Sequence, residues 1–96
     1  MNQNDDNKQE IQVNMPTELQ GGTYANQMLV SHTPEEFILD FVLTTAPIAT
    51  VNARVVISPA HAKRMIQALQ ESVQHYEAQF GDITVLEAIP QGVIRH

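Results

Sequence analysis

The sequence contains no cysteine. Disulfide bonds and thiolate metal sites are therefore excluded, and a reducing compartment is compatible with the composition. No apolar run approaches the length that a membrane-spanning helix needs. Residues 1–10 are almost all Asn, Gln, Asp and Glu, and they lack the basic start and the apolar stretch of a secretory signal peptide. We therefore expect a cytoplasmic protein without a membrane partner.

Positive charge is also scarce. The chain has 5 Lys and Arg against 11 Asp and Glu, so its formal net charge is −6. General affinity for phosphate backbones comes from Lys and Arg, and this balance argues against nucleic acid as a partner. With 96 residues the chain is long enough for one small domain of marginal stability, which self-association would help. We expect a disordered tail over residues 1–10, one domain over 11–90 and a frayed end over 91–96.

The clearest predicted element is a helix between Ser58 and Gly81. Ser58 suits the N-cap, Pro59 the first helical position, and Gly81 the left-handed residue after a helix. Apolar residues between them recur every three or four positions: Ala62, Ile66, Leu69, Val73, Tyr76 and Phe80. This stripe predicts a helix that packs across the chain's own sheet. Its regular spacing also fits a helix paired with a copy of itself.

Three segments before this helix have the alternation of strands. We expect a strand over 24–32, a tight turn over 33–36 with Pro34 at its second position, and a strand over 36–44. A third strand over 51–57 follows a loop at Pro47. Folding back symmetrically about Pro47 places Asp40 opposite Arg54, an oppositely charged pair. The same register pairs apolar residues on the other face: Phe37 with Ile57, Leu39 with Val55, Phe41 with Ala53 and Leu43 with Val51.

The flanking segments are less regular. Alternation of Ile11, Val13 and Met15 predicts a short edge strand that ends at Pro16, and residues 20–22 form a turn before the main fold. After the helix, residues 83–89 are apolar enough to form an edge strand or an arm on a partner subunit.

Together these elements predict an α+β fold, in which an antiparallel β-meander of three to four strands is packed by one long C-terminal helix. One helix covers only one face of a sheet. The second face also carries apolar residues, Ile38, Val42 and Val56, beside Asp40 and Arg54. Uncovered apolar surface indicates a partner, and we therefore expect a homo-oligomer, most simply a homodimer.

No catalytic motif is present. His32, His61, His75 and His96 are too scattered for a metal motif, and the chain has neither a Gly-x-Ser-x-Gly sequence nor a glycine-rich phosphate loop. We therefore expect no enzyme activity, no metal and no cofactor.

Two groups of residues are candidates for binding. Asp40 and Arg54 either pair with each other or serve an interface. The second group lies at the start of the helix: Ser58, His61, Lys63 and Arg64. Positive charge there opposes the helix dipole, so it is either compensated by acidic groups nearby or forms a site for an anion or an acidic segment.

Four motifs resemble those of a bacterial family catalogued as domain of unknown function 3467. They are Tyr24-Ala25-Asn26, Ser31-His32-Thr33-Pro34-Glu35-Glu36-Phe37-Ile38-Leu39-Asp40-Phe41, Arg54-Val55-Val56-Ile57-Ser58-Pro59-Ala60-His61-Ala62-Lys63-Arg64, and Tyr76-Glu77-Ala78-Gln79-Phe80-Gly81. The resemblance spans about residues 22–83. It implies a small cytoplasmic protein with no assigned activity. In some bacteria such proteins are encoded beside RNA polymerase large subunits, which implies a link to transcription.

Three functional hypotheses follow. The first is a non-enzymatic interaction module that docks on a larger, unidentified protein assembly. The second is a client-binding chaperone, because antiparallel strands followed by a long helix look similar in outline to the export chaperone SecB. The third is a nucleic-acid accessory protein that uses Lys63 and Arg64, which the acidic composition disfavours.

Overall fold

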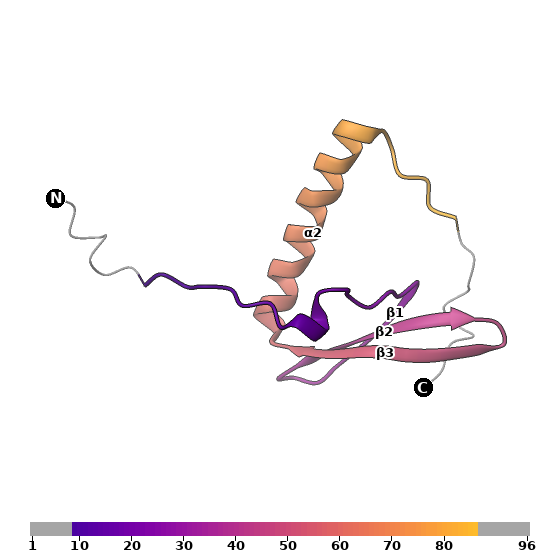
Figure 1. The fold of residues 1–96 in the computed structure, drawn as a ribbon, viewed down its shortest axis with the longest axis horizontal. Coiled ribbons are helices and arrows are strands. Elements are labelled where there is room, and N and C mark those ends of the chain that lie inside the picture. The colour runs from indigo at the N-terminus through magenta and orange to yellow at the C-terminus, as the bar shows by residue number, and fades with distance from the viewer. Residues whose placement is uncertain (1–8, 87–96) are drawn as a thin grey trace.

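The structure is a computed structural model that describes residues 9–86. A 3-10 turn, η1 (Thr17–Leu19), precedes three strands, β1 (Gln27–His32), β2 (Phe37–Thr45) and β3 (Ile48–Ile57), and one helix, α2 (Pro59–Phe80) (Figure 1). The strands form one antiparallel sheet in the order β1-β2-β3. A sheet followed by a single C-terminal helix confirms the predicted α+β class.

The β1–β2 hairpin confirms the turn over residues 33–36. The backbone N–H of Thr33 donates to the carbonyl of Glu36 at 2.8 Å, and the Thr33 hydroxyl accepts from the N–H groups of Glu35 and Glu36. Strand β1 begins at Gln27, three residues later than predicted. Before it, the side chain of Asn26 continues the ladder: it donates to the carbonyl of Thr44 at 3.0 Å and accepts from the N–H of Thr44 at 2.9 Å.

The β2–β3 pairing matches the prediction at the end of the sheet that leads into α2. The predicted partners are found for Phe37, Leu39, Asp40 and Phe41, which face Ile57, Val55, Arg54 and Ala53. The predicted pair of Leu43 with Val51 is wrong. A register shift after Phe41 places Val51 opposite Val42, and Leu43 opposite Thr50.

A β-bulge at Asn52 explains this shift. Only two residues, Ala46 and Pro47, connect β2 to β3, and the peptide bond between them is cis. This short connection pairs Thr45 with Ile48, and continuing that register along the strands would not bring Phe37 opposite Ile57. The strand β3 therefore has one extra residue, Asn52, which bulges out and restores the pairing of Phe37 with Ile57. The side chain of Asn52 also donates to the carbonyl of Tyr24 at 3.0 Å, which holds the segment before β1 beside the sheet.

The two faces of the sheet differ in composition. Residues Met28, Val30, Phe37, Leu39, Phe41 and Ile57, which we call the front face, line a groove beneath the start of α2. The rear face carries Asp40 and Val42, which alternate with these along β2. Among the described residues, the buried apolar side chains are Leu39 and Val42, and Asp40 is the buried charged one. Two apolar side chains are a small core for a domain of this size.

Helix α2 begins and ends where the sequence predicts. The Ser58 hydroxyl accepts from the N–H of His61 at 3.1 Å, and Pro59 occupies the first helical position. Gly81 has a φ of 95° and donates its N–H to the carbonyl of Glu77 at 2.9 Å. Only glycine adopts this conformation without strain, so the helix ends there.

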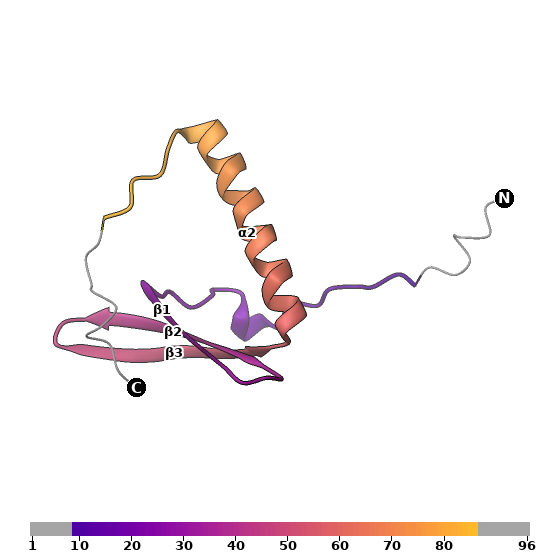
Figure 2. The same cartoon turned by 180° about the vertical axis from the view of Figure 1, so that it is seen from behind.

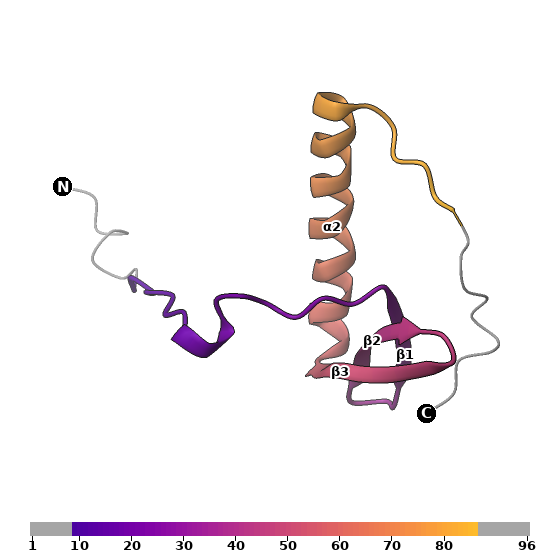
Figure 3. The same cartoon turned by 45° about the vertical axis from the view of Figure 1, so that its right-hand side comes forward.

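The expectation that α2 crosses the whole sheet is wrong. The helix rises at a steep angle from the end of β3, and its C-terminal end points away from the strands (Figures 1 and 3). No α2 residue is buried, and Leu69 and Phe80 are 62% and 66% exposed. Ser58 alone joins β3 to α2, which fixes the start of the helix at one end of the sheet. A helix about 33 Å long that leaves at this angle packs on the sheet only through its first turns.

The flanking predictions have mixed outcomes. Residues 11–15 form no strand, because within residues 9–86 no other strand pairs with them, and Ile11, Val13 and Met15 are exposed. The turn at residues 20–22 is confirmed, with Gly22 at a φ of 72°. No strand occurs over residues 81–86. The predictions for residues 1–8, 87–90 and 91–96 lie outside the described residues. Figure 2 shows the sheet and helix from behind.

Candidate interaction surface

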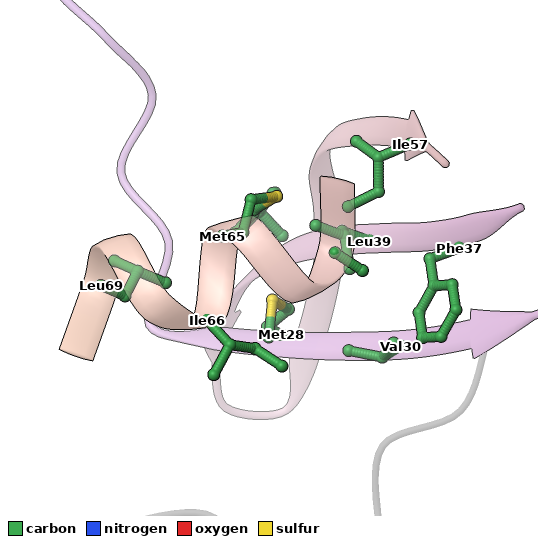
Figure 4. Close-up of a pocket in the computed structure, with 10 residues that line it drawn as sticks. Met28, Val30, Phe37, Leu39, Ile57, Met65, Ile66 and Leu69 are labelled. Atoms are coloured by element: carbon green, nitrogen blue, oxygen red, sulfur yellow. The ribbon is translucent and has the colours of Figure 1, made fainter. Parts of the chain in front are cut away.

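An apolar groove separates the start of α2 from the front face of the sheet. Its volume is about 290 Å³. Figure 4 shows side chains from both walls pointing toward one another. The ten residues that line it all have apolar side chains: Met28, Val30, Phe37, Leu39, Phe41, Ile57, Ala62, Met65, Ile66 and Leu69. Because its walls carry no charged or hydroxyl group within residues 9–86, this groove is suited to apolar contacts.

The apolar surface continues beyond the groove along α2. Val73, Tyr76 and Phe80 follow Leu69 in the same stripe and are 42%, 50% and 66% exposed. The ring centroids of Tyr76 and Phe80 lie 5.0 Å apart, so the two rings form one continuous aromatic surface. Groove and stripe together form a contiguous apolar surface, which we call the apolar patch. Patches of this kind mark sites of association in soluble proteins.

Asp40 and Arg54 form the ion pair that the register predicts. The guanidinium Nε lies 2.6 Å from Oδ1 of Asp40, and Nη2 lies 2.8 Å from Oδ2. These hydrogen bonds, and then the negative charge of Asp40, raise the pKa of Arg54. Asp40 is 1% exposed on the rear face, so its carboxylate does not line the groove. This bidentate contact supports a role in holding β2 and β3 together.

The other predicted binding residues lie at the start of α2. Ser58 uses its hydroxyl as the helix cap, so the N–H of His61 is already occupied. Pro59 has no N–H, and Ala62 donates to the carbonyl of Ser58. Arg64 Nη2 lies 3.5 Å from Nδ1 of His61. Most of the first-turn N–H groups that an anion would need are therefore engaged, and the anion site stays a prediction.

The structure does not gather the two groups of predicted site residues into one site. Asp40 and Arg54 lie on the rear face, whereas Ser58, His61, Lys63 and Arg64 lie on the first turns of α2. The groove instead uses residues that the sequence did not single out, above all Met28, Val30 and Met65. The sequence showed that Met28 and Val30 lie on the same side of a predicted strand, but it did not show which face of the sheet they occupy. Met65 lies beside the predicted stripe and widens it.

Neither a metal site nor a membrane span is found in the described part of the chain. No three His, Asp or Glu side chains within residues 9–86 are placed to hold a metal ion. No helix in that range combines the length and apolarity needed to cross a bilayer. Two buried polar atoms there, Gln27 Nε2 and Thr44 Oγ1, have no hydrogen-bond partner, and their residues lie next to Val42 on the rear face.

Comparison with known proteins identifies a family. A family model described as "Protein of unknown function (DUF3467)" matches residues 1–85, which is most of the chain. No curated protein and no solved structure matches this chain.

Proposed function

We propose that this chain, which belongs to the DUF3467 family of proteins of unknown function, is a non-enzymatic interaction module: a homodimer that docks on a larger protein assembly. The observation that carries the proposal is the apolar patch. A groove lined only by apolar side chains continues into a helix whose stripe is exposed at Val73, Tyr76 and Phe80. Leaving such a surface in water is unfavourable, at roughly 25 cal/mol for each Å² of apolar area.

The small core supports the same proposal. Leu39 and Val42 are the apolar side chains buried in the part of the chain that the structure describes. Small domains bury a low fraction of their surface even when compact, and they commonly gain stability from association. A partner that covers the apolar patch would enlarge this core.

A tagged form of the 96-residue chain tests docking. We expect it to recover one stoichiometric partner from the native host, and we expect Leu69→Asp to lose that partner, because a carboxylate in the centre of the apolar patch must be desolvated when the homodimer that docks is formed. Gln74→Asp is the matched control, because it adds the same charge to α2 outside the stripe. Equal recovery by all three proteins would contradict docking that depends on the apolar patch.

A client-binding chaperone is the second candidate. Met28 and Met65 lie on opposite walls of the groove, and methionine adapts its shape to varied apolar segments. If this function holds, the wild-type chain suppresses the aggregation of several unrelated unfolded proteins, and Leu69→Asp does not. Suppression of none of them would remove this candidate and leave the interaction module.

A further inference from the structure

The stripe of α2 has the spacing of a helix that pairs with another helix. Its six members run from Ala62 to Phe80 in steps that alternate between four and three residues, as the a and d positions of a heptad do. The sheet contacts only the first part of the stripe, which lines the groove as far as Leu69. Val73, Tyr76 and Phe80 lie beyond the groove and are 42%, 50% and 66% exposed, and Ile66 and Leu69 are still 66% and 62% exposed although they line it. The sheet therefore leaves most of the stripe uncovered, and the stripe has the pattern of a helix–helix seam.

Charge is distributed unequally along the flank of this seam. Lys63 follows the stripe residue Ala62, and Glu77 follows the stripe residue Tyr76, so both lie on the same side of the stripe, two heptads apart. The start of α2 also carries Arg64, and its second half carries Glu71. A helix that is basic at one end and acidic at the other attracts a copy of itself in the antiparallel orientation.

Antiparallel pairing also matches the sizes of the stripe residues. Aligning two copies so that Leu69 faces Val73 of the second copy places Ile66 opposite the second Tyr76, and Ala62 opposite the second Phe80. In this alignment the smallest side chain of the stripe, Ala62, packs against the large ring of Phe80, and the side chains of the other two pairs are all of medium or large size. In the same alignment Lys63 lies beside Glu77 of the second copy, and this contact occurs twice by symmetry.

This alignment accounts for the groove as well. Ala62 and Ile66 are groove residues, so the aromatic side chains that face them from the second copy approach the front face near Phe37 and Leu39. Each helix thus brings its exposed C-terminal half over the groove of the other chain. A parallel pairing would instead place Ala62 against Ala62, far from both Phe80 rings, and would bring the two basic helix starts together.

From these observations we infer that the occupant of the apolar patch is a second copy of this chain, whose α2 lies antiparallel to the first and is positioned by reciprocal Lys63–Glu77 contacts. Glu77 is suited to this role because Oε2 accepts from the N–H of Ile83 at 2.9 Å, which fixes the carboxylate, and a carboxylate accepts several hydrogen bonds. The inference deepens the homodimer in the proposed function and rests on it.

Charge exchange tests the orientation. Lys63→Glu alone places like charges at both contacts, and so does Glu77→Lys alone. We expect each variant to raise the dimer dissociation constant about tenfold, as measured by sedimentation velocity on the full chain. In an equimolar mixture of the two variants, both contacts of a heterodimer again join one acidic and one basic side chain, so we expect heterodimers with the wild-type constant. Glu71→Lys is the matched control for Glu77→Lys, because it makes the same exchange on the opposite side of α2.

Crosslinking provides a second readout that does not depend on charge. The natural chain has no cysteine, so a single substitution introduces the only thiol. Gln70 lies midway between Lys63 and Glu77 on the same flank, so the antiparallel alignment brings the two Gln70 positions together across the two-fold axis. Parallel pairing holds them on opposite sides of the seam. We expect a short bis-maleimide to join two Gln70→Cys chains efficiently, and two Gln74→Cys chains poorly.

The outcomes separate this inference from the proposed function. A wild-type dimer whose constant is unchanged by Lys63→Glu and Glu77→Lys, and which does not crosslink at position 70, overturns the antiparallel arrangement and leaves the homodimer intact. A wild-type monomer overturns both the arrangement and the homodimer, while docking on another protein is still decided by Leu69→Asp. A raised dissociation constant in each single variant, recovery of the wild-type constant in their mixture and crosslinking at position 70 together support the inference.

Discussion

Polar side chains with defined partners fix the sheet of this protein. Asp40 is buried among apolar neighbours, and the guanidinium of Arg54 reaches it with two hydrogen bonds from the neighbouring strand while remaining 59% exposed. A buried carboxylate is tolerated when it is paired in this way. Asn26 and Asn52 act on the backbone instead, by bonding to Thr44 and Tyr24.

Arg54 is expected to be more sensitive to substitution than its exposure suggests. Lysine cannot reproduce the forked contact, and alanine removes two of the hydrogen bonds that the buried carboxylate accepts, so the unfolding temperature should fall in the order wild type, Arg54→Lys, Arg54→Ala. The pKa of Arg54 is raised in the folded state, so its stabilising contribution is complete below the ordinary arginine pKa and is lost only at higher pH.

The difference in unfolding free energy between wild type and Arg54→Ala should therefore stay constant from about pH 7 to about pH 9. Urea unfolding across this range measures it. A difference that changes steeply with pH would contradict the assignment of the effect to this guanidinium.

Ser58 offers a second test at the residue scale. Its hydroxyl caps α2 through the N–H of His61, so Ser58→Ala should lower the unfolding free energy by about 1 kcal/mol, and Ser58→Asp should retain most of it. Urea unfolding followed by circular dichroism provides the comparison. Equal stability of Ser58→Ala and the wild type would show that the cap contributes nothing measurable.

A helix or strand could be predicted from the sequence where residues close to it in the chain determine its limits or its pairing. The limits of α2 follow from Ser58, Pro59 and Gly81, which act within a few residues, and the sequence predicted them correctly. The register near Phe37 follows from matched apolar faces. The bulge at Asn52 was not predictable from local residues. It arises because the two-residue connection imposes one register at its end of the hairpin, while the apolar pairs near Phe37 impose another at the far end. The steep angle of α2 was missed because periodicity indicates which face is apolar, not what covers it.

The ladder beyond β1 leads to a prediction for Asn26. Its side chain forms two hydrogen bonds with the backbone of Thr44, at the place where β1 has not yet begun. Asn26→Ala should lower the unfolding free energy by about 1–2 kcal/mol, with faster hydrogen exchange at the Thr44 amide. Asn26→Asp keeps the acceptor and should retain protection of that amide. Unchanged exchange in Asn26→Ala would contradict this role for the side chain.

At the scale of the whole molecule, the candidate site was predicted only in part. The stripe of α2 was evident from spacing, and the same spacing already fitted a helix paired with its copy. The sequence favoured the chain's own sheet as the main cover, whereas in the structure the sheet faces only the first turns of the helix and leaves Ile66 and Leu69 there 66% and 62% exposed. The remaining surface is open, so the stability of the chain should depend on what it binds.

That dependence predicts an unfolding temperature that rises with protein concentration, because a dimer dissociates as it unfolds. Leu69→Asp should abolish the dependence by removing association, whereas Gln74→Asp should preserve it. Differential scanning calorimetry at several concentrations measures both. A wild-type unfolding temperature that is independent of concentration would contradict coupling between folding and association.

If another chain covers the apolar patch of groove and exposed helix stripe, the solution mass of the 96-residue chain will show it. Sedimentation equilibrium from micromolar to near-millimolar concentration should give twice the mass of one 96-residue chain. A single-chain mass throughout that range, with α2 still formed by circular dichroism, would contradict the claim that a second copy provides the cover.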